Sequence, residues 1–465
     1  MRLSFFGHRS ARVLDKCLRG LPGWATITTI CVAATAMGYR GDWPTPVETF
    51  TLFATIVGIW GALHLPSRKS RVACAVLWVV LLVSLGLPTP PQRIGVDFRT
   101  FYEGSQILFD RHQSPYLAPG TTAFPFPTFF LIRLLSSAGR FSLEPTFLCF
   151  VGLQIVLLGI GLVLMRRVVR TETSGQDSDL ARGLIQAGLL FHPVVLGGIG
   201  VGNSSVVAGV ALIYAVWSWR CGSGEWWRHA SAISLNLAWM VKPQLLMATG
   251  FFLICWWLER RQRPSALSRA AAIGRLVVPW AIALMAVSLP AAFPGSALAY
   301  RDFPWVAISW HTRIAEAYPN NYALSAILAK AVARILAVPA SQTLPFLTAG
   351  IASLALLWNG LSLVAGKLDS LRAFLPWLLT TLIWTSLVWE WYLSLVLAGL
   401  LLMVGLACGT PVSQMSFGRL RLYAGIGFTM VLSSFAFMLG VLLLYFHSHE
   451  LRAREVTDAR GIANT

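Results

Sequence analysis

The sequence predicts an all-α polytopic membrane protein with about 12–13 transmembrane helices, each of roughly 20 residues. Of its 465 residues, 56% are hydrophobic and only 12% are charged, whereas about a quarter of the residues in a soluble domain are charged. The mean hydropathy is +0.66. Apolar stretches long enough to cross about 30 Å of hydrocarbon recur from Trp24 to Phe446. One multi-helix domain within a bilayer is therefore expected.

The net charge is +18, a balance that often marks a nucleic-acid partner, because polyphosphates attract Lys and Arg. Here the basic residues cluster in short segments between apolar runs, such as Arg68, Lys69 and Arg71, or Arg166, Arg167 and Arg170, or Arg260, Arg261 and Arg263. This is the positive-inside pattern that orients membrane helices. We therefore expect a lipid bilayer as partner and no nucleic acid.

Cysteine usage indicates neither disulfides nor a metal. The seven cysteines are scattered, mostly in apolar runs, and form no CxxC pair, so we expect no disulfide framework and no zinc site. A cofactor is not expected either. The basic start of the chain, from Arg2 to Arg19, precedes an apolar stretch as in a signal peptide. No small-residue cleavage site is evident there, which favours a retained signal anchor.

Residues 1–90 are expected to form three transmembrane helices, at about 24–40, 47–65 and 71–88, with the N-terminus inside. The segment from Leu87 to Pro127 then lies outside. Within it, apolar residues at helical spacing from Asp97 to Phe109 predict a helix on the membrane surface. The stretch from Phe124 to Leu135 is short and holds two prolines, which favours a re-entrant or broken helix.

Residues 91–410 are expected to form the membrane core with its outer loops. A span at about 143–165 runs inward and ends at three arginines. Two apolar stretches follow, at 183–219 and 230–258, and polar residues interrupt them at 200–205 and at Lys242-Pro243-Gln244. Because basic residues flank this pair of stretches, both interruptions are predicted to be hairpin tips on the outside, toward Asp97.

The rest of the chain alternates spans with outer segments. A span at about 275–292 precedes a loop from Phe293 to Asn321, and a loop of that length is usually functional. An amphipathic segment leads to spans at about 343–365, 372–388, 391–407 and 422–446, with Trp389-Glu390-Trp391-Tyr392 as an outer tip. Residues 411–465 are expected to hold the last transmembrane helix and, after His447, a charged, disordered tail.

Asp97 is the candidate general base. It follows the third predicted span in Gly95-Val96-Asp97-Phe98. A carboxylate at the mouth of a membrane cavity, partly shielded from water, has a raised pKa and accepts a proton. The alternative is that Asp97 is the N-cap of the surface helix, and the local pattern alone favours that alternative.

Candidate substrate ligands share this outer face, and each has a plainer alternative. Lys242 pairs with a phosphate, or it snorkels to the head-group layer. His311 and Arg313 in the long loop bind a phosphate head group, or they are solvated beside aromatic interface anchors. Glu390 accepts sugar hydroxyls between stacking aromatic rings, or it is one acid within an aromatic belt.

Taken together, these segments resemble glycosyltransferase family 87, whose members include the polyprenol-phosphate-mannose-dependent alpha-mannosyltransferases. The likeness runs from about Gly95 to about Leu406. The matching runs are Asp97-Phe98, Phe101-Tyr102, Ser114-Pro115-Tyr116 and Phe124-Pro125-Phe126-Pro127, then Gly200 and Asn203 for Gly-Gln-x-Asn, and Lys242-Pro243 for Lys-Pro. The departures are Val201 for Gln, Phe126-Pro127-Thr128 for Tyr-Pro-Pro, Asn320-Asn321-Tyr322 near an Asn-Gln-Ser motif, and Trp389-Glu390-Trp391-Tyr392 for a His-rich element.

The resemblance implies a GT-C-type membrane glycosyltransferase. Such enzymes move a hexose or pentose, here mannose or a related sugar, from a polyprenyl-phosphate-linked donor to an acceptor hydroxyl of a glycan or glycolipid, usually without a metal. The reaction takes place on the periplasmic or extracellular side of the cytoplasmic membrane. The resemblance implies Asp97 as base, and the residues then expected to bind substrate are Tyr102, Tyr116, Asn203, Lys242, His311, Arg313, Asn321 and Glu390.

Two other functions remain open. A transporter or flippase of a lipid-linked saccharide would use the same residues without cleaving a bond, although the sequence has no internal repeat of the kind usual in secondary transporters. A non-catalytic family member serving as a membrane partner is the third possibility. The retained Asp97 argues against it.

Overall fold

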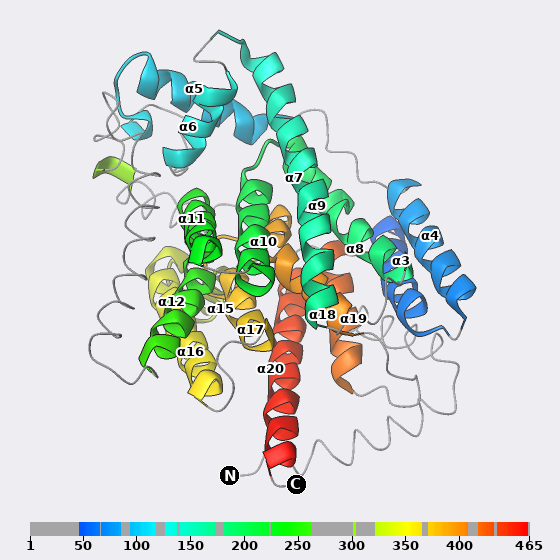
Figure 1. Cartoon of the computed structure of the whole chain (residues 1–465). Coiled ribbons are helices and arrows are strands. Elements are labelled where there is room, and N and C mark those ends of the chain that lie inside the picture. The colour runs from blue at the N-terminus through cyan, green and yellow to red at the C-terminus, as the bar shows by residue number, and fades with distance from the viewer. Residues whose placement is uncertain are drawn as a thin grey trace.

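The structure is a computed structural model of an all-helical protein (Figure 1). It describes residues 46–65, 67–84, 94–117, 126–136, 140–172, 180–222, 225–261, 301–303, 321–364, 371–407, 417–431 and 435–463. Those ranges contain no β-strand, so the predicted all-α class is confirmed.

The helices follow the apolar stretches of the sequence closely. In chain order they are α3 (Pro46–His64), α4 (Arg68–Ser84), α5 (Val96–Phe109), η2 (Pro115–Leu117), α6 (Phe126–Leu135), α7 (Leu143–Glu172), α8 (Leu180–Leu190), α9 (Pro193–Gly200), α10 (Ser205–Cys221), α11 (Glu225–Val241), η3 (Pro243–Leu245), α12 (Leu246–Arg261), α15 (Leu324–Leu336), α16 (Ala340–Val364), α17 (Leu371–Ile383), η5 (Glu390–Val396), α18 (Leu397–Leu406), α19 (Phe417–Val431) and α20 (Phe435–Ala463).

Within the described part of the chain, three helical segments are long and apolar enough to cross a membrane: Leu143–Glu172, Leu180–Gly200 and Ala340–Leu361. Large apolar side chains on the outside of α7, such as Val156 and Val163, are more than half exposed, which suits contact with lipid. Helices that could span a membrane are thus present, while the total of about 12–13 spans and the GT-C arrangement stay predictions.

A helix, α5, is present where the sequence predicted a surface helix, and both predicted interruptions are present. The short stretch after α5 is α6, and the interruptions separate α9 from α10 and α11 from α12. The position of α5 on a membrane surface stays a prediction. The spans expected at 24–40 and 275–292 lie outside the described residues.

The C-terminal prediction is wrong. The sequence was expected to form one span at 422–446 and then a disordered tail, but α19 and α20 are two helices packed against each other, and α20 continues to Ala463. A Cβ on Gly425 would lie 2.7 Å from Leu444 and 3.0 Å from the carbonyl oxygen of Gly440, so the absence of a side chain permits this close packing. Hydropathy averaged over both helices does not register the chain reversal between them.

The helices α5 and α6 lie together at one end of the long helices, near the start of α7 (Figure 1). An aromatic cluster holds them there, in which the ring of Phe98 lies 5.2 Å from that of Phe147 and 5.5 Å from that of Phe150. From Phe147 to Arg166, α7 extends roughly 28 Å at about 1.5 Å per residue. Asp97 and the arginines of α7 therefore lie at opposite ends of one helix, about a hydrocarbon thickness apart.

Candidate functional site

The start of α5 is bound to the tip between α9 and α10. The backbone N–H of Gly95 donates to the carbonyl of Gly200 at 2.8 Å, and that of Asp97 donates to the carbonyl of Val201 at 2.9 Å. Gly202 makes this approach possible, because its φ of +80° suits glycine and a Cβ there would lie 2.4 Å from the Cβ of Phe98. Backbone groups far apart in sequence thus satisfy donors at the start of α5.

Asp97 is bonded to Asn203. The side-chain amide of Asn203 donates to Oδ2 of Asp97 at 2.6 Å, and Oδ1 of Asn203 accepts from the backbone N–H of Ser205 at 2.9 Å. Asn203 is fully buried, so its orientation is fixed on both sides. The predicted convergence of the α9–α10 tip on Asp97 is confirmed by this contact.

The N-cap interpretation of Asp97 is wrong. Gly95 is the N-cap of α5 and supplies no side-chain bond, while Asp97 lies within the first turn and bonds across to Asn203. The carboxylate is nevertheless placed where the positive end of the helix dipole favours a negative charge. Local pattern alone suggested a cap because it does not register the partner 106 residues away.

Crowding by protein atoms raises the pKa of the Asp97 carboxyl above its ordinary value, because it removes water from the charged form. The hydrogen bond from Asn203 and the positive charge of Lys242 act in the opposite direction and lower this pKa, but burial is the larger effect. The side chain itself is only partly covered. Asp97 is therefore a partly exposed residue whose carboxyl group gains a proton more readily than that of an ordinary aspartate.

Lys242 lies between α11 and η3, with 2% of its surface exposed. Its ammonium nitrogen lies 4.9 Å from the centre of the Tyr392 ring, a cation–π distance, and its charge acts on Asp97. The side chain thus points into the protein toward the candidate base, which disfavours the snorkelling alternative. Both hairpin tips supply a side chain to the same region, as the sequence predicted.

Tyr392 is a member of the site that sequence reasoning missed. It belongs to η5, beside Trp389 and Trp391, whose rings lie 5.2 Å apart. The residue that the sequence predicted as a ligand at this tip is Glu390, which begins η5 but whose side chain lies outside the described part of the structure. The sequence signal that could have identified Tyr392 is the aromatic run Trp389-Glu390-Trp391-Tyr392. The last residue of this run carries the ring that faces Lys242.

The side-chain amide of Asn321 forms hydrogen bonds with the backbone of a distant segment. Its Nδ2 donates to the carbonyl of Ser386 at 2.8 Å, and its Oδ1 accepts from the backbone N–H of Val388 at 3.0 Å. These bonds join the end of the long loop to the segment before Trp389. Asn321 was expected to bind substrate, but its amide is used to position the aromatic tip.

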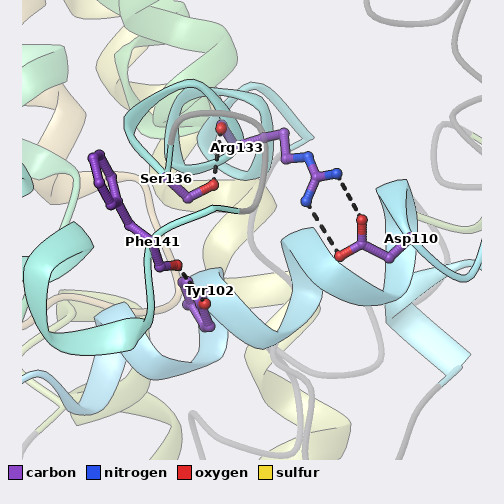
Figure 2. A network of polar contacts seen from close by, with 5 residues as sticks. All are labelled: Tyr102, Asp110, Arg133, Ser136 and Phe141. Atoms are coloured by element: carbon purple, nitrogen blue, oxygen red, sulfur yellow. Dashed lines mark hydrogen bonds and ion pairs between the residues drawn. The ribbon is translucent and has the colours of Figure 1, made fainter.

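The two tyrosines expected to bind substrate are also held by the protein. Figure 2 shows the hydroxyl of Tyr102 donating to the carbonyl of Phe141, at 2.9 Å, beside the ion pair of Arg133 with Asp110. Tyr116 is 5% exposed and packs against Phe129 and Phe303. Tyr102 thus joins α5 to the residue two positions before α7, and Tyr116 joins η2 to α6 and to the first described residues of the long loop. The structure gives both tyrosines a packing role.

His311 and Arg313 lie outside the described residues. Among the residues that are described, no group of three His, Cys, Asp or Glu side chains is arranged to hold a metal ion. The expectation of a metal-free, cofactor-free site stays a prediction.

Comparisons with models of known families, with curated proteins and with solved structures find no match for this chain. The resemblance to glycosyltransferase family 87 therefore remains a prediction. The geometry itself defines an all-helical protein with membrane-type helices, in which a carboxylate, an amide and a buried ammonium group meet at one end of α7. Such a site combines a group that accepts a proton with a group that stabilises negative charge.

Proposed function

We propose that the chain is a membrane glycosyltransferase that uses a polyprenyl-phosphate-linked sugar, mannose or a related hexose or pentose, and transfers it to an acceptor hydroxyl outside the cytoplasmic membrane. The observation that carries the proposal is the bond between Asp97 and Asn203 beside the charge of Lys242. A base and a phosphate-binding cation are the two groups that this reaction requires of a protein that uses no metal.

In the proposed reaction, the acceptor oxygen attacks the anomeric carbon of the donor sugar. Asp97 takes the proton of that hydroxyl, a new bond forms between the anomeric carbon and the acceptor oxygen, and the bond from this carbon to the phosphate oxygen breaks. The products are the glycosylated acceptor and polyprenyl phosphate. The raised pKa of Asp97 suits this role, because a stronger base takes the proton more readily.

Lys242 stabilises the negative charge that collects on the departing phosphate. Its burial against Tyr392 strengthens electrostatic attraction, since the local dielectric constant is low. Asn203 acts as a positioning residue, because it holds the carboxylate of Asp97 and is itself held by Ser205.

The test is the transfer of radiolabelled mannose from polyprenyl-phosphate mannose by membranes that contain the Asp97→Asn protein. We expect a loss of about 100-fold or more, the usual contribution of a general base. Glu103→Gln is the matched control, because it removes an exposed carboxylate from the same helix. Normal transfer by Asp97→Asn at equal protein level would overturn the assignment of the base.

A second assay separates this proposal from a flippase of a lipid-linked saccharide. Purified protein in detergent has no two compartments, so a flippase forms no product there. Formation of a new glycosidic bond under these conditions supports the transferase. If purified protein moves a lipid-linked saccharide across reconstituted vesicles and forms no bond in detergent, the transferase proposal fails.

A further inference from the structure

A second polar region lies at the other end of α7. Arg166, Arg167 and Arg170 occupy the last turns of this helix and are exposed, and α8 begins at Leu180 close by. Arg182, in the first turn of α8, is only 8% exposed. A guanidinium group that deep inside a protein is unfavourable unless an anion compensates its charge.

Within the described part of the chain, Arg182 has no such compensation. Its Nε is buried without a hydrogen-bond partner. The carboxylate of Glu172, at the end of α7, pairs instead with Arg220 at 2.6 Å. Arg182 therefore has donors available for a ligand.

A second guanidinium lies against the same turn of α8. Gly183 has no side chain, and a Cβ placed there would lie 2.9 Å from Nη2 of Arg166. Side chains of a helix lean toward its N-terminus, so that of Arg182 is directed to the start of α8. The helix dipole makes that start positive as well. The first turn of α8 thus holds the buried Arg182, and the guanidinium of Arg166 lies against the next residue, Gly183.

A row of exposed apolar side chains runs along α7 toward this end of the helix. Val156, Ile160 and Val163 are each 46–59% exposed and precede Arg166 along the helix. A ligand that carries a phosphate and long acyl chains would contact both regions at once. A free phosphate would use only the charged part.

We propose that Arg166, Arg182 and the start of α8 bind the phosphate group of an anionic membrane lipid, whose acyl chains lie along α7. Basic pockets between membrane helices bind acidic lipid head groups by this chemistry, and the forked guanidinium matches phosphate oxygens. The site is separate from Asp97 and does not depend on the proposed transfer reaction.

Native mass spectrometry of the full chain in neutral detergent tests the proposal. We expect phosphatidylglycerol to bind more tightly than phosphatidylcholine with the same acyl chains. Arg182→Gln and Arg166→Gln should each weaken the binding of phosphatidylglycerol about tenfold, the usual cost of losing one charge-assisted hydrogen bond. Arg140→Gln is the matched control, since it removes the same charge from an exposed position beside the other end of α7, and less than about a twofold change is expected.

Two further variants keep the test decisive if Arg182→Gln does not fold. Gly183→Ala keeps every charge but displaces the guanidinium of Arg166, so weaker lipid binding is expected. Asp97→Asn should bind the lipid normally. Equal weakening by Arg140→Gln and Arg166→Gln, equal affinity for the two lipids, or full displacement of the lipid by millimolar inorganic phosphate would each overturn the proposal.

Discussion

The two ends of α7 contrast in how their charges are compensated. At the Asp97 end the protein supplies the partners: Asn203 bonds the carboxylate, Ser205 bonds Asn203, and Lys242 adds a positive charge. At the Arg182 end, the guanidinium of Arg166 lies against Gly183 of α8, and the buried Nε of Arg182 has no hydrogen-bond partner within the described residues. The first end is therefore organised before a ligand binds, whereas the second gains stability from an anion supplied by the surroundings.

Lys242→Met should give the largest effect among the variants that sharpen this contrast. It removes the buried cation that faces Tyr392, so we expect transfer to fall about 100-fold, as when one stabilising donor is lost from a transition state. The exposed Lys69 provides the control variant Lys69→Met. Lipid binding at the Arg182 end should stay unchanged, and a joint loss at both ends would show that the ends are coupled.

Gly202→Ala should disturb the backbone contact between the α9–α10 tip and the start of α5, which holds Asp97. A side chain at φ +80° is strained, and its Cβ would meet Phe98, so we expect a loss of about 2–3 kcal/mol in the free energy of unfolding and lower transfer. Gly152→Ala is the control, since a Cβ there has no atom within 4 Å. The midpoint of thermal unfolding is measured for both variants, Gly202→Ala and Gly152→Ala. Equal midpoints would contradict the tight approach of α5 to the α9–α10 tip.

The pH dependence of transfer tests the proton chemistry of Asp97. Only the ionised carboxylate accepts a proton, so the rate falls as the pH decreases through its pKa, and the raised pKa places that fall above about pH 4. Asn203→Leu removes a bond that lowers this pKa, so the fall should move to still higher pH. Initial rates between about pH 4 and pH 9 measure the shift. A profile identical to that of the unaltered chain would contradict the role of Asn203 in holding the base.

The smallest effect is expected for the ion pair shown in Figure 2. Arg133 and Asp110 have side-chain exposures of 21% and 46%, so solvent screens their attraction. Arg133→Gln should lower the free energy of unfolding by about 1 kcal/mol or less, measured by thermal unfolding. The double variant with Asp110→Asn should cost little more than either single change. A much larger loss would show that this network, as well as the Asn203 contact, positions α5.

The sequence by itself determined the features that depend on neighbouring residues. Hydropathy and helical spacing predicted the all-α class, a helix at α5, and the interruptions before Asn203 and after Val241, because these patterns are local. The charge distribution also placed both tips with Asp97. The division of the last apolar stretch into α19 and α20 was missed, since average hydropathy does not change where the chain reverses.

Only the tertiary structure decided which polar groups meet. Asp97 bonds Asn203 instead of capping α5, Tyr392 lies over Lys242, and the hydroxyl of Tyr102 is used in packing. The sequence also did not predict the burial of Arg182, because it does not distinguish one buried arginine from the many exposed ones. Each of these outcomes depends on helices that are distant along the chain, and their close packing fixes partners and removes water. Those two effects, which no local pattern contains, make one aspartate the candidate base and one arginine the candidate lipid ligand.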